Sequence, residues 1–218
     1  MLFRSQTDWA PSALGNFQWA QHRWLLMQGR CEEALQCALK QAEHGRHRDT
    51  GFAEVVLGSN VAGCEIALGR LHDAEARARA ALATLRARGI HTPMVGHVLE
   101  ALSLTLALQG RHAEAIEAGR QAQGHLAQEG DDLRLLEPLA LCAAGQQRFV
   151  DAARVAGHVD AAHARSGEVR WPAAAQRRAQ LDAALAGALA AQDRARLLAE
   201  GARLSRDEAF ELAVGLAG

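Results

Sequence analysis

The sequence contains no tyrosine, and aromatic residues make up only 4% of its 218 positions although 49% are hydrophobic. A core with so few rings must consist mainly of alanine and leucine, which favour helix over strand. Lysine is almost absent too, because Lys40 is the lone lysine and arginine supplies the remaining positive charge. The formal net charge is −1, whereas binding nucleic acid through its phosphates needs clustered positive charge. We therefore expect no direct nucleic-acid binding by this chain.

Cysteine is scarce, and no Cys-x-x-Cys pair occurs. The surroundings of the four cysteines are mostly helical and apolar, which predicts reduced thiols that are buried or half-buried: Cys31, Cys37, Cys64 and Cys142. No apolar run approaches the ~20 residues of a membrane span, and no apolar segment typical of a signal peptide follows Met1. We expect a cytoplasmic protein with no membrane contact.

The patterns of common cofactor and catalytic sites are also missing. No Gly-x-x-x-x-Gly-Lys-Ser/Thr phosphate loop and no Gly-x-Ser-x-Gly nucleophile turn is present. Among ten histidines, His44 and His47 form the closest pair, but they straddle a predicted helix end without a third ligand at a standard spacing. We expect no cofactor, no metal and no enzymatic activity, although Ser-His-Asp catalysis by dispersed residues stays open.

What the sequence does contain is one phrase repeated at a nearly constant interval. It reads Gly-Arg followed by four residues that end in alanine, and a worn fourth copy begins Gln-Arg; the copies span 29–34, 69–74, 110–115 and 147–152. The final alanines are separated by 40, 41 and 37 residues. A period of this size indicates stacked structural repeats.

Each copy lies between two apolar helical segments, so it predicts the turn of a helical hairpin. Glycine closes the first helix in the left-handed conformation at little cost. An acidic residue in the first turn of the second helix interacts favourably with the helix dipole, and the alanine allows close helix packing. One hairpin cannot bury its own apolar face, so we expect the hairpins to stack.

These residues resemble the tetratricopeptide repeat family, in which the turn glycine is followed five residues later by a nearly universal alanine. The corresponding residues here are Ala34, Ala74, Ala115 and Ala152. Ala38, Ala78 and Gly119 stand where the family usually has an aromatic residue, and the period exceeds the family's 34 residues. The resemblance implies an all-α solenoid of four long tetratricopeptide-like hairpins.

We predict hairpins at about 12–46, 50–89, 92–129 and 132–166, which together form a repeat region over 1–166, and capping helices within 167–218. Ser12 is expected to cap the first helix, and Thr92 with Pro93 to start the fifth. Pro138 should kink its helix or mark its beginning. Gly89 should end the helix at about 71–88, whose apolar stripe is Ala74, Ala78, Ala81 and Leu85.

In the tail we expect helices at about 172–190 and 193–200, and then a final helix through Ala213 with Ser205 and Glu208 as a capping box. These helices lack the repeated phrase. A terminal unit of different sequence is what an open stack needs to cover its last apolar face.

Two tail phrases, 153–160 and 200–209, resemble the C-terminal end of large bacterial transcriptional regulators. In that family a tetratricopeptide-like region is joined to a STAND-type ATPase and a helix-turn-helix domain. The second phrase matches the family's Glu-Gly-x-x-Leu-Ser-x-x-Glu-Ala. The first departs from Ala-Arg-Leu-Leu-Gly-Ala-Ala-Glu at Val155, Ala156, His158 and Val159. If the resemblance holds, the ATPase lies outside this chain.

The family's pattern places the first helix of each hairpin on a concave groove, and its polar or aromatic residues are our candidate binding residues: Trp19, Arg23, Ser59, Asn60, His97, Glu100, Arg134 and Glu137. Ser59 and Asn60 interrupt an apolar run, which is unfavourable unless they hydrogen-bond or face water. Three alternatives stay open: Asn60 satisfies a neighbouring backbone group, Trp19 belongs to the core, and the charged residues form an ordinary solvated face.

Three functions follow as hypotheses. The first is the regulatory or sensor region of a bacterial transcription regulator, which binds a protein, a peptide or a small-molecule effector in the groove and shifts the equilibrium of attached domains. The second is a stand-alone scaffold that docks partner proteins. The third, an unrecognised helical enzyme, would require a histidine whose mutation abolishes turnover while the fold stays intact.

Overall fold

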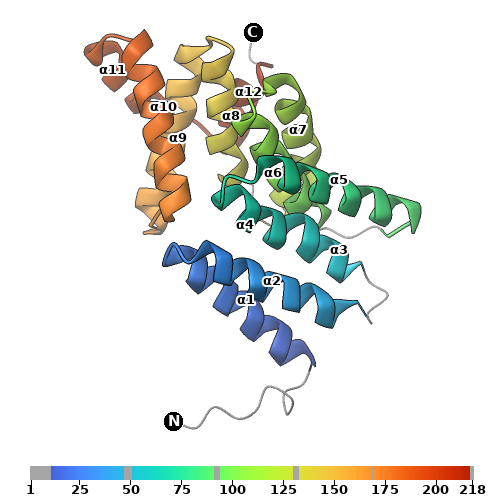
Figure 1. The fold of residues 1–218 in the computed structure, drawn as a ribbon. Coiled ribbons are helices and arrows are strands. Elements are labelled where there is room, and N and C mark those ends of the chain that lie inside the picture. The colour runs from blue at the N-terminus through green and yellow to red at the C-terminus, as the bar shows by residue number, and fades with distance from the viewer. Residues whose placement is uncertain (1–10, 47–50, 91–93, 130–132, 168, 217–218) are drawn as a thin grey trace. The chain divides into compact units, whose positions relative to one another are not determined.

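The computed structural model describes residues 11–46, 51–90, 94–129, 133–167 and 169–216, and every regular element in these ranges is a helix (Figure 1). The chain divides into two compact units, residues 1–92 and 93–218. The all-α class and the helical hairpins expected from the sequence are confirmed. No helix in the described ranges is long and apolar enough to cross a membrane.

The N-terminal unit contains two hairpins, the second of which has a first arm interrupted by a π-helical turn. Its elements are α1 (Pro11–Met27), α2 (Cys31–Gly45), α3 (Phe52–Val56), η2 (Leu57–Val61), α4 (Ala62–Ala67) and α5 (Leu71–Ala87). The predicted stripe of α5 is buried, and Gly89 ends the segment with a positive φ of 62°.

The π-helical turn differs from the regular helix expected in the first arm of the hairpin at about 50–89. The amide of Ala62 donates to the carbonyl of Leu57, five residues earlier, and the Ser59 hydroxyl donates to the carbonyl of Val55 at 2.6 Å. A π-turn inserts one extra residue into the helix and so rotates the side chains that follow. The pattern of apolar residues did not reveal this rotation.

The C-terminal unit contains two further hairpins and three closing helices: α6 (Val95–Leu108), α7 (His112–Glu129), α8 (Leu133–Gly145), α9 (Phe149–Ser166), α10 (Pro172–Ala188), α11 (Ala191–Gly201) and α12 (Arg206–Val214). Figure 1 shows α10 and α11 beside α9, and α11 packs extensively on α9.

Some predicted helix ends are wrong. Ser12 cannot cap α1 because that helix already includes Pro11. Pro138 does not begin α8, which starts five residues earlier and continues through the proline. Thr50, Thr92 and Pro93 lie outside the described residues, and so does His47. The capping box of α12 is confirmed, because the Ser205 side chain and the Glu208 carboxylate each bind the other's backbone amide.

The repeated phrase forms the same turn four times. Gly29, Gly69 and Gly110 have φ of 71°, 74° and 76°, and Gln147 in the worn copy has φ of 63°. The next residue, always arginine, donates its amide to a carbonyl five residues earlier at 2.8–2.9 Å. Together with the shorter bond from the left-handed residue, this is the Schellman closure of a helix. Gln147 therefore adopts the left-handed conformation that glycine adopts in the other three turns.

The arginine of the phrase has its own role, which the sequence analysis did not identify. Its carbonyl accepts the first hydrogen bond of the next helix, from the phrase's final alanine, at 3.0–3.1 Å. Three of these arginines pair with the acid three residues later: Arg30 with Glu33, Arg111 with Glu114, and Arg148 with Asp151. The fourth, Arg70, reaches back to Glu32 of the previous repeat. The arginines thus add side-chain contacts to the turn.

The small residues of the phrase lie where helices meet. Ala34, Ala74, Ala115 and Ala152 are completely buried. Gly119 is buried as well, and a Cβ there would lie 2.9 Å from the Leu139 side chain. The alanines are thus part of the core, and Gly119 lets α7 approach α8 of the next hairpin closely.

The two tail phrases meet in the structure, where α9 crosses α11. A Cβ at Gly157 would lie 2.1 Å from the carbonyl oxygen of Leu198, and one at Gly201 would lie 1.9 Å from that of Arg154. Next to this backbone contact, the Arg154 guanidinium pairs with Glu200 at 2.8 Å. The contact holds α11 firmly on the last hairpin.

Helix α12 is fixed by arginines that neutralise its carboxyl end. Arg148 donates to the carbonyls of Leu212 and Ala213 at 2.8 and 2.9 Å, and Arg120 donates to that of Val214 at 3.1 Å. Cations interact favourably with the unpaired carbonyls at a helix C-terminus. The fourth Gly-Arg-type turn therefore also anchors the last helix.

Candidate protein-interaction surface

Helix α1 exposes two tryptophans, each stacked with an arginine. The Arg23 guanidinium carbon lies 4.7 Å from the Trp19 ring centre, and that of Arg30 lies 5.6 Å from the Trp24 ring centre. Both distances fall within the range of a cation–π interaction. Trp19 is 46% and Trp24 is 52% exposed, so the indoles stand at the surface with their polar partners beside them.

The buried face of α1 explains why the tryptophans are exposed. Leu25 is buried against α2 together with Ala34, Ala38 and Val61. Leu25 and Trp24 are adjacent in sequence and therefore point about 100° apart around the helix. Met27, which is 50% exposed, follows Trp24 by three positions on the same side. Packing with α2 thus leaves Trp24 and Met27 together on the outside.

Residue types at this surface are those that dominate protein interfaces. Tryptophan and arginine are enriched among residues that contribute most of the binding energy, and methionine is enriched at interfaces in general. Among the aromatic residues that the structure describes, only Trp19 and Trp24 are exposed, and both lie on α1. We call Trp19, Arg23, Trp24, Met27 and Arg30 the α1 surface.

A groove runs beside the α1 surface, between α1 and α2, with a volume of about 630 Å³. Its walls combine the Trp24 ring with amides and charged groups, among them Gln21, Arg30, Glu33 and Lys40. The mixture of an aromatic wall with hydrogen-bonding groups can accommodate a peptide side chain.

Ser59 and Asn60 are turned toward partners within the N-terminal unit. Besides the Ser59 bond to its own helix, the Asn60 amide donates to Oε1 of Gln41 on α2 at 3.0 Å. Gln41, itself 3% exposed, donates to the carbonyl of Gly15 on α1 at 3.1 Å. Asn60 is thus satisfied by a side chain rather than by a backbone group. A role of either residue in binding stays a prediction.

A buried histidine completes this polar layer, and the sequence analysis missed it. His22 is 4% exposed, and its ring lies against the backbone of Asn60. Burial, with a smaller contribution from the Arg23 charge, lowers the pKa of His22 to about 4. The ring is neutral at physiological pH. Its position three residues after Trp19 on a helix gave no sign of burial.

The four predicted groove residues of the C-terminal unit lie together on its first-helix face, the face made by α6 and α8. Glu100 on α6 pairs with Arg134 on α8 at 3.2 Å, and His97 Nδ1 lies 3.9 Å from the same carboxylate. Glu137, on the same helix as Arg134, pairs instead with Arg170 at 2.5 Å. Whether these side chains bind a partner stays a prediction.

Glu100 is the most deeply placed acid of this group, with 9% of the residue exposed. Burial by itself raises the pKa of Glu100, but the charge of Arg134, with His97 and Arg177, outweighs it and holds the pKa below the usual range. The buried carboxylate is therefore ionised and depends on its cationic neighbours.

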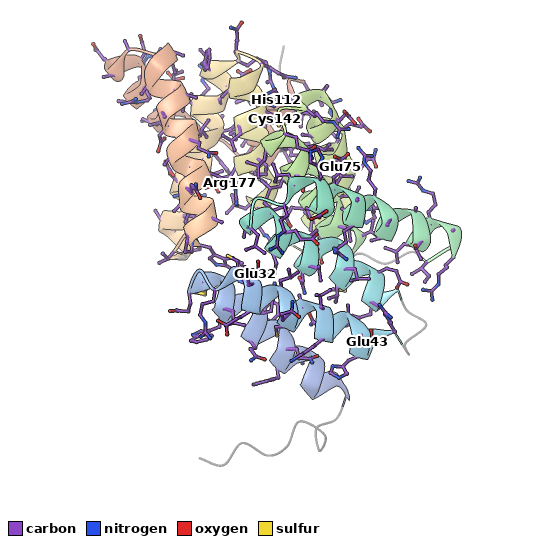
Figure 2. The ribbon with its side chains drawn as sticks, in the orientation of Figure 1. Glu32, Glu43, Glu75, His112, Cys142 and Arg177 are labelled. Atoms are coloured by element: carbon purple, nitrogen blue, oxygen red, sulfur yellow. The ribbon has the colours of Figure 1, made fainter. Side chains whose placement is uncertain are left out.

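Those neighbours include arginines of the tail, which the sequence analysis did not assign to the face. Arg177 on α10, labelled in Figure 2, is close enough to Glu137 and Glu100 for their charges to raise its pKa. Burial is the larger effect and lowers the pKa of Arg177 overall. The arginines of the tail are evident in the sequence, but the carboxylates that they pair with could not be predicted from it.

Two of the thiols, Cys64 and Cys142, are completely buried. Burial raises the pKa of Cys64 and of Cys142 to about 12, so neither is a thiolate at neutral pH. All four cysteines are free, as expected, and Cys31 is the most exposed of them. Within the described ranges, no cluster of three or more His, Cys, Asp or Glu side chains has metal-binding geometry.

Comparison with known proteins supports the repeat architecture. The tetratricopeptide repeat family model matches residues 54–125, a range that contains two copies of the Gly-Arg phrase and runs from α3 into α7. No curated protein and no solved structure gave a significant match. Tetratricopeptide repeats generally mediate protein–protein interaction. The helical hairpins within residues 54–125 are therefore similar to tetratricopeptide repeats.

Proposed function

We propose that this chain is a non-enzymatic regulatory module that binds a protein or peptide through the α1 surface. The observation that carries the proposal is the pair of half-exposed tryptophans, each stacked with an arginine, on one helix. A rigid indole loses little conformational entropy on binding, and its arginine is already in place. The surface is thus organised before the partner arrives.

The experiment compares partner capture by the wild-type chain with capture by Trp24→Ala, using proteins cross-linked to the chain in cells of its source. Truncating an interface tryptophan costs roughly 2 kcal/mol or more, or about 30-fold in affinity. Val169→Ser is the matched control, because Val169 is 81% exposed in the other unit. If Trp24→Ala captures as much partner as Val169→Ser does, the α1 surface is excluded as the binding site.

We further propose that the module is the C-terminal sensor region of a cytoplasmic bacterial transcription regulator, in which a bound protein or small-molecule effector shifts the state of attached ATPase and DNA-binding domains. The two tail phrases support this, since their shared residues make one packed contact between α9 and α11. A ligand shifts such an equilibrium only by its difference in affinity for the two states.

The genomic DNA upstream of the Met1 codon tests this assignment. An open frame that continues into a phosphate-binding loop and a helix-turn-helix supports the regulator. A nearby stop codon with a ribosome-binding site before Met1 supports the alternative, a stand-alone scaffold, and leaves the α1 surface unaffected.

A further inference from the structure

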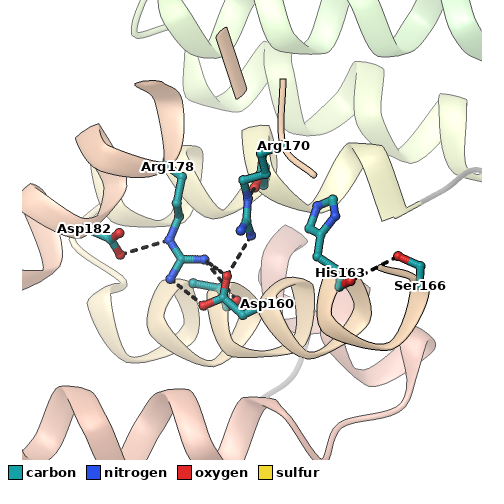
Figure 3. Close-up of polar contacts among 8 residues, drawn as sticks. Asp160, His163, Ser166, Arg170, Arg178 and Asp182 are labelled. Atoms are coloured by element: carbon teal, nitrogen blue, oxygen red, sulfur yellow. Dashed lines mark hydrogen bonds and ion pairs between the residues drawn. The ribbon is translucent and has the colours of Figure 1, made fainter. Parts of the chain in front are cut away.

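Helix α10 packs on the C-terminal unit mainly through charges. Of its 17 residues only Leu181 and Leu185 are buried. Beside them, the Arg178 guanidinium, whose side chain is 12% exposed, pairs with Asp160 of α9 and, at 2.9 Å, with Asp182 of its own helix (Figure 3). Arg170, just before the helix, binds the same Asp160 at 2.7 Å. Two leucines and two arginines thus hold the segment.

Three carboxylates near the arginines of α10 come from three different helices, and one of them, Glu100, is also paired with Arg134 of α8. Glu100 belongs to α6, Glu137 to α8 and Asp160 to α9. Arg170 bridges the last two, at 2.5 Å to Glu137. Because these carboxylates sit on packed repeat helices, they stay in place whether or not α10 covers them. We call Glu100, Glu137 and Asp160 the acidic site.

The fit of α10 to the acidic site is incomplete. Arg177 is close enough to Glu137 and Glu100 to interact with their charges, but its buried Nε has no hydrogen-bond partner among the described residues. A buried charge without full hydrogen bonding is costly. The present occupant of the site is therefore held less tightly than its number of charges suggests.

Helix α10 is flanked by non-helical backbone on both sides. Gly167 ends α9 in the left-handed conformation, and Trp171 before α10 is extended with ψ of 156°. After α10, Leu189 and Ala190 are extended too. The helices before and after α10, α9 and α11, are in close backbone contact with each other at Gly157 and Gly201. Helix α10 is thus a separate segment between two anchored ones.

We propose that the acidic site is a helix-docking site whose resident occupant, α10, is displaced by an arginine-bearing amphipathic helix of a partner protein. The partner helix presents two adjacent arginines followed by leucines three and seven positions after the second, the spacing of Arg177, Arg178, Leu181 and Leu185. This site is independent of the α1 surface, since it lies in the other unit and uses other residues.

Native-state hydrogen exchange of the wild-type chain is the first test. The amides of α10 are expected to exchange as a group at least 10-fold faster than those of α9 and α11, because α10 opens without them. Equal protection of the three helices would overturn the proposal, since α10 would then belong to the same cooperative core.

Peptide binding is the second test. Ala179 is exposed in the middle of α10, so Ala179→Pro breaks this helix without touching the acidic site, and Ala179→Ser is the matched control. A peptide with the sequence of residues 169–189 should bind Ala179→Pro at least 100-fold more tightly than Ala179→Ser, in which the tethered helix competes.

Replacing both adjacent arginines of the peptide by glutamine should weaken its binding to Ala179→Pro at least 10-fold, and raised salt should weaken binding of the native peptide. Failure of the native peptide to bind, or binding that ignores the arginines, refutes the acidic site. General unfolding of Ala179→Pro refutes the independence of α10. None of these results depends on whether Trp24→Ala loses its partner.

Discussion

Replacing Gln147 with glycine should stabilise the C-terminal unit. Gln147 is the one non-glycine residue with positive φ in the described part of the chain, at 63°. An L-residue in the left-handed region costs about 1–2 kcal/mol, whereas glycine loses about 0.5–1 kcal/mol more conformational free energy on folding. The difference predicts a gain of about 0.5–1 kcal/mol for Gln147→Gly.

The reverse change at the equivalent position of the previous repeat is the matched control. Gly110 has φ of 76°, and a Cβ there would meet nothing within 4 Å, so Gly110→Gln tests the backbone term without a clash. Both residues lie in the same unit. Gly110→Gln should lose about as much stability as Gln147→Gly gains, and the double change should restore the wild-type value, since a glutamine then simply moves from one turn to the other.

Urea denaturation followed by circular dichroism measures both changes as shifts in the midpoint at constant slope. A gain of about 1 kcal/mol corresponds to roughly 2–4 °C in Tm for a chain of this size. A neutral or destabilising Gln147→Gly would refute the argument that backbone strain at this turn is what glycine relieves. A changed slope would mean that the unfolded state, and not the turn, had responded.

Three further predictions concern buried groups. The pKa of His22 is about 4 in the folded chain and about 6.5 in the unfolded chain. The free energy of unfolding should therefore fall by about 3 kcal/mol as the pH decreases from 6.5 to 4. Urea titrations of His22→Leu at several pH values should lack this part of the pH dependence. Gly201→Ala would put a Cβ 1.9 Å from a carbonyl oxygen of α9 and should lower the unfolding midpoint strongly, whereas Gly187→Ala, which meets nothing within 4 Å, should not lower it. Cys64 and Cys142 should resist iodoacetamide at pH 7 until urea unfolds the chain, as mass spectrometry of the alkylated protein would reveal.

The sequence predicts most of the helices because their ends are chemically marked. The Gly-Arg phrase identifies each hairpin turn, and its fourth copy remains readable although Gln147 replaces the glycine. The capping box at Ser205 marks the last helix in the same local way. These signals depend on residues within one turn of each other, so no knowledge of the tertiary structure is needed.

Features that depend on distant partners were not predictable in this way. The π-turn at Leu57–Val61 accompanies a hydrogen bond from Asn60 to Gln41 of another helix. The burial of His22 likewise follows from tertiary packing. It was not predictable from the sequence, because α1 carries polar residues on several sides. The candidate residues Glu100 and Glu137 were grouped by the family's pattern, but the arginines that neutralise them come from a tail that lacks the pattern.

The tail phrases show which positions of a motif its structural role constrains. Arg154 and Gly157 agree with the family's phrase, and they make the ion pair to Glu200 and the backbone contact at Gly201. Val155 departs from it yet is completely buried, because a packed apolar position accepts another apolar residue when neighbours adjust. A glycine in backbone contact has no such substitute. Arg154, Gly157, Glu200 and Gly201 are thus the positions of the two phrases that join α9 to α11, and replacing either glycine would force these helices apart.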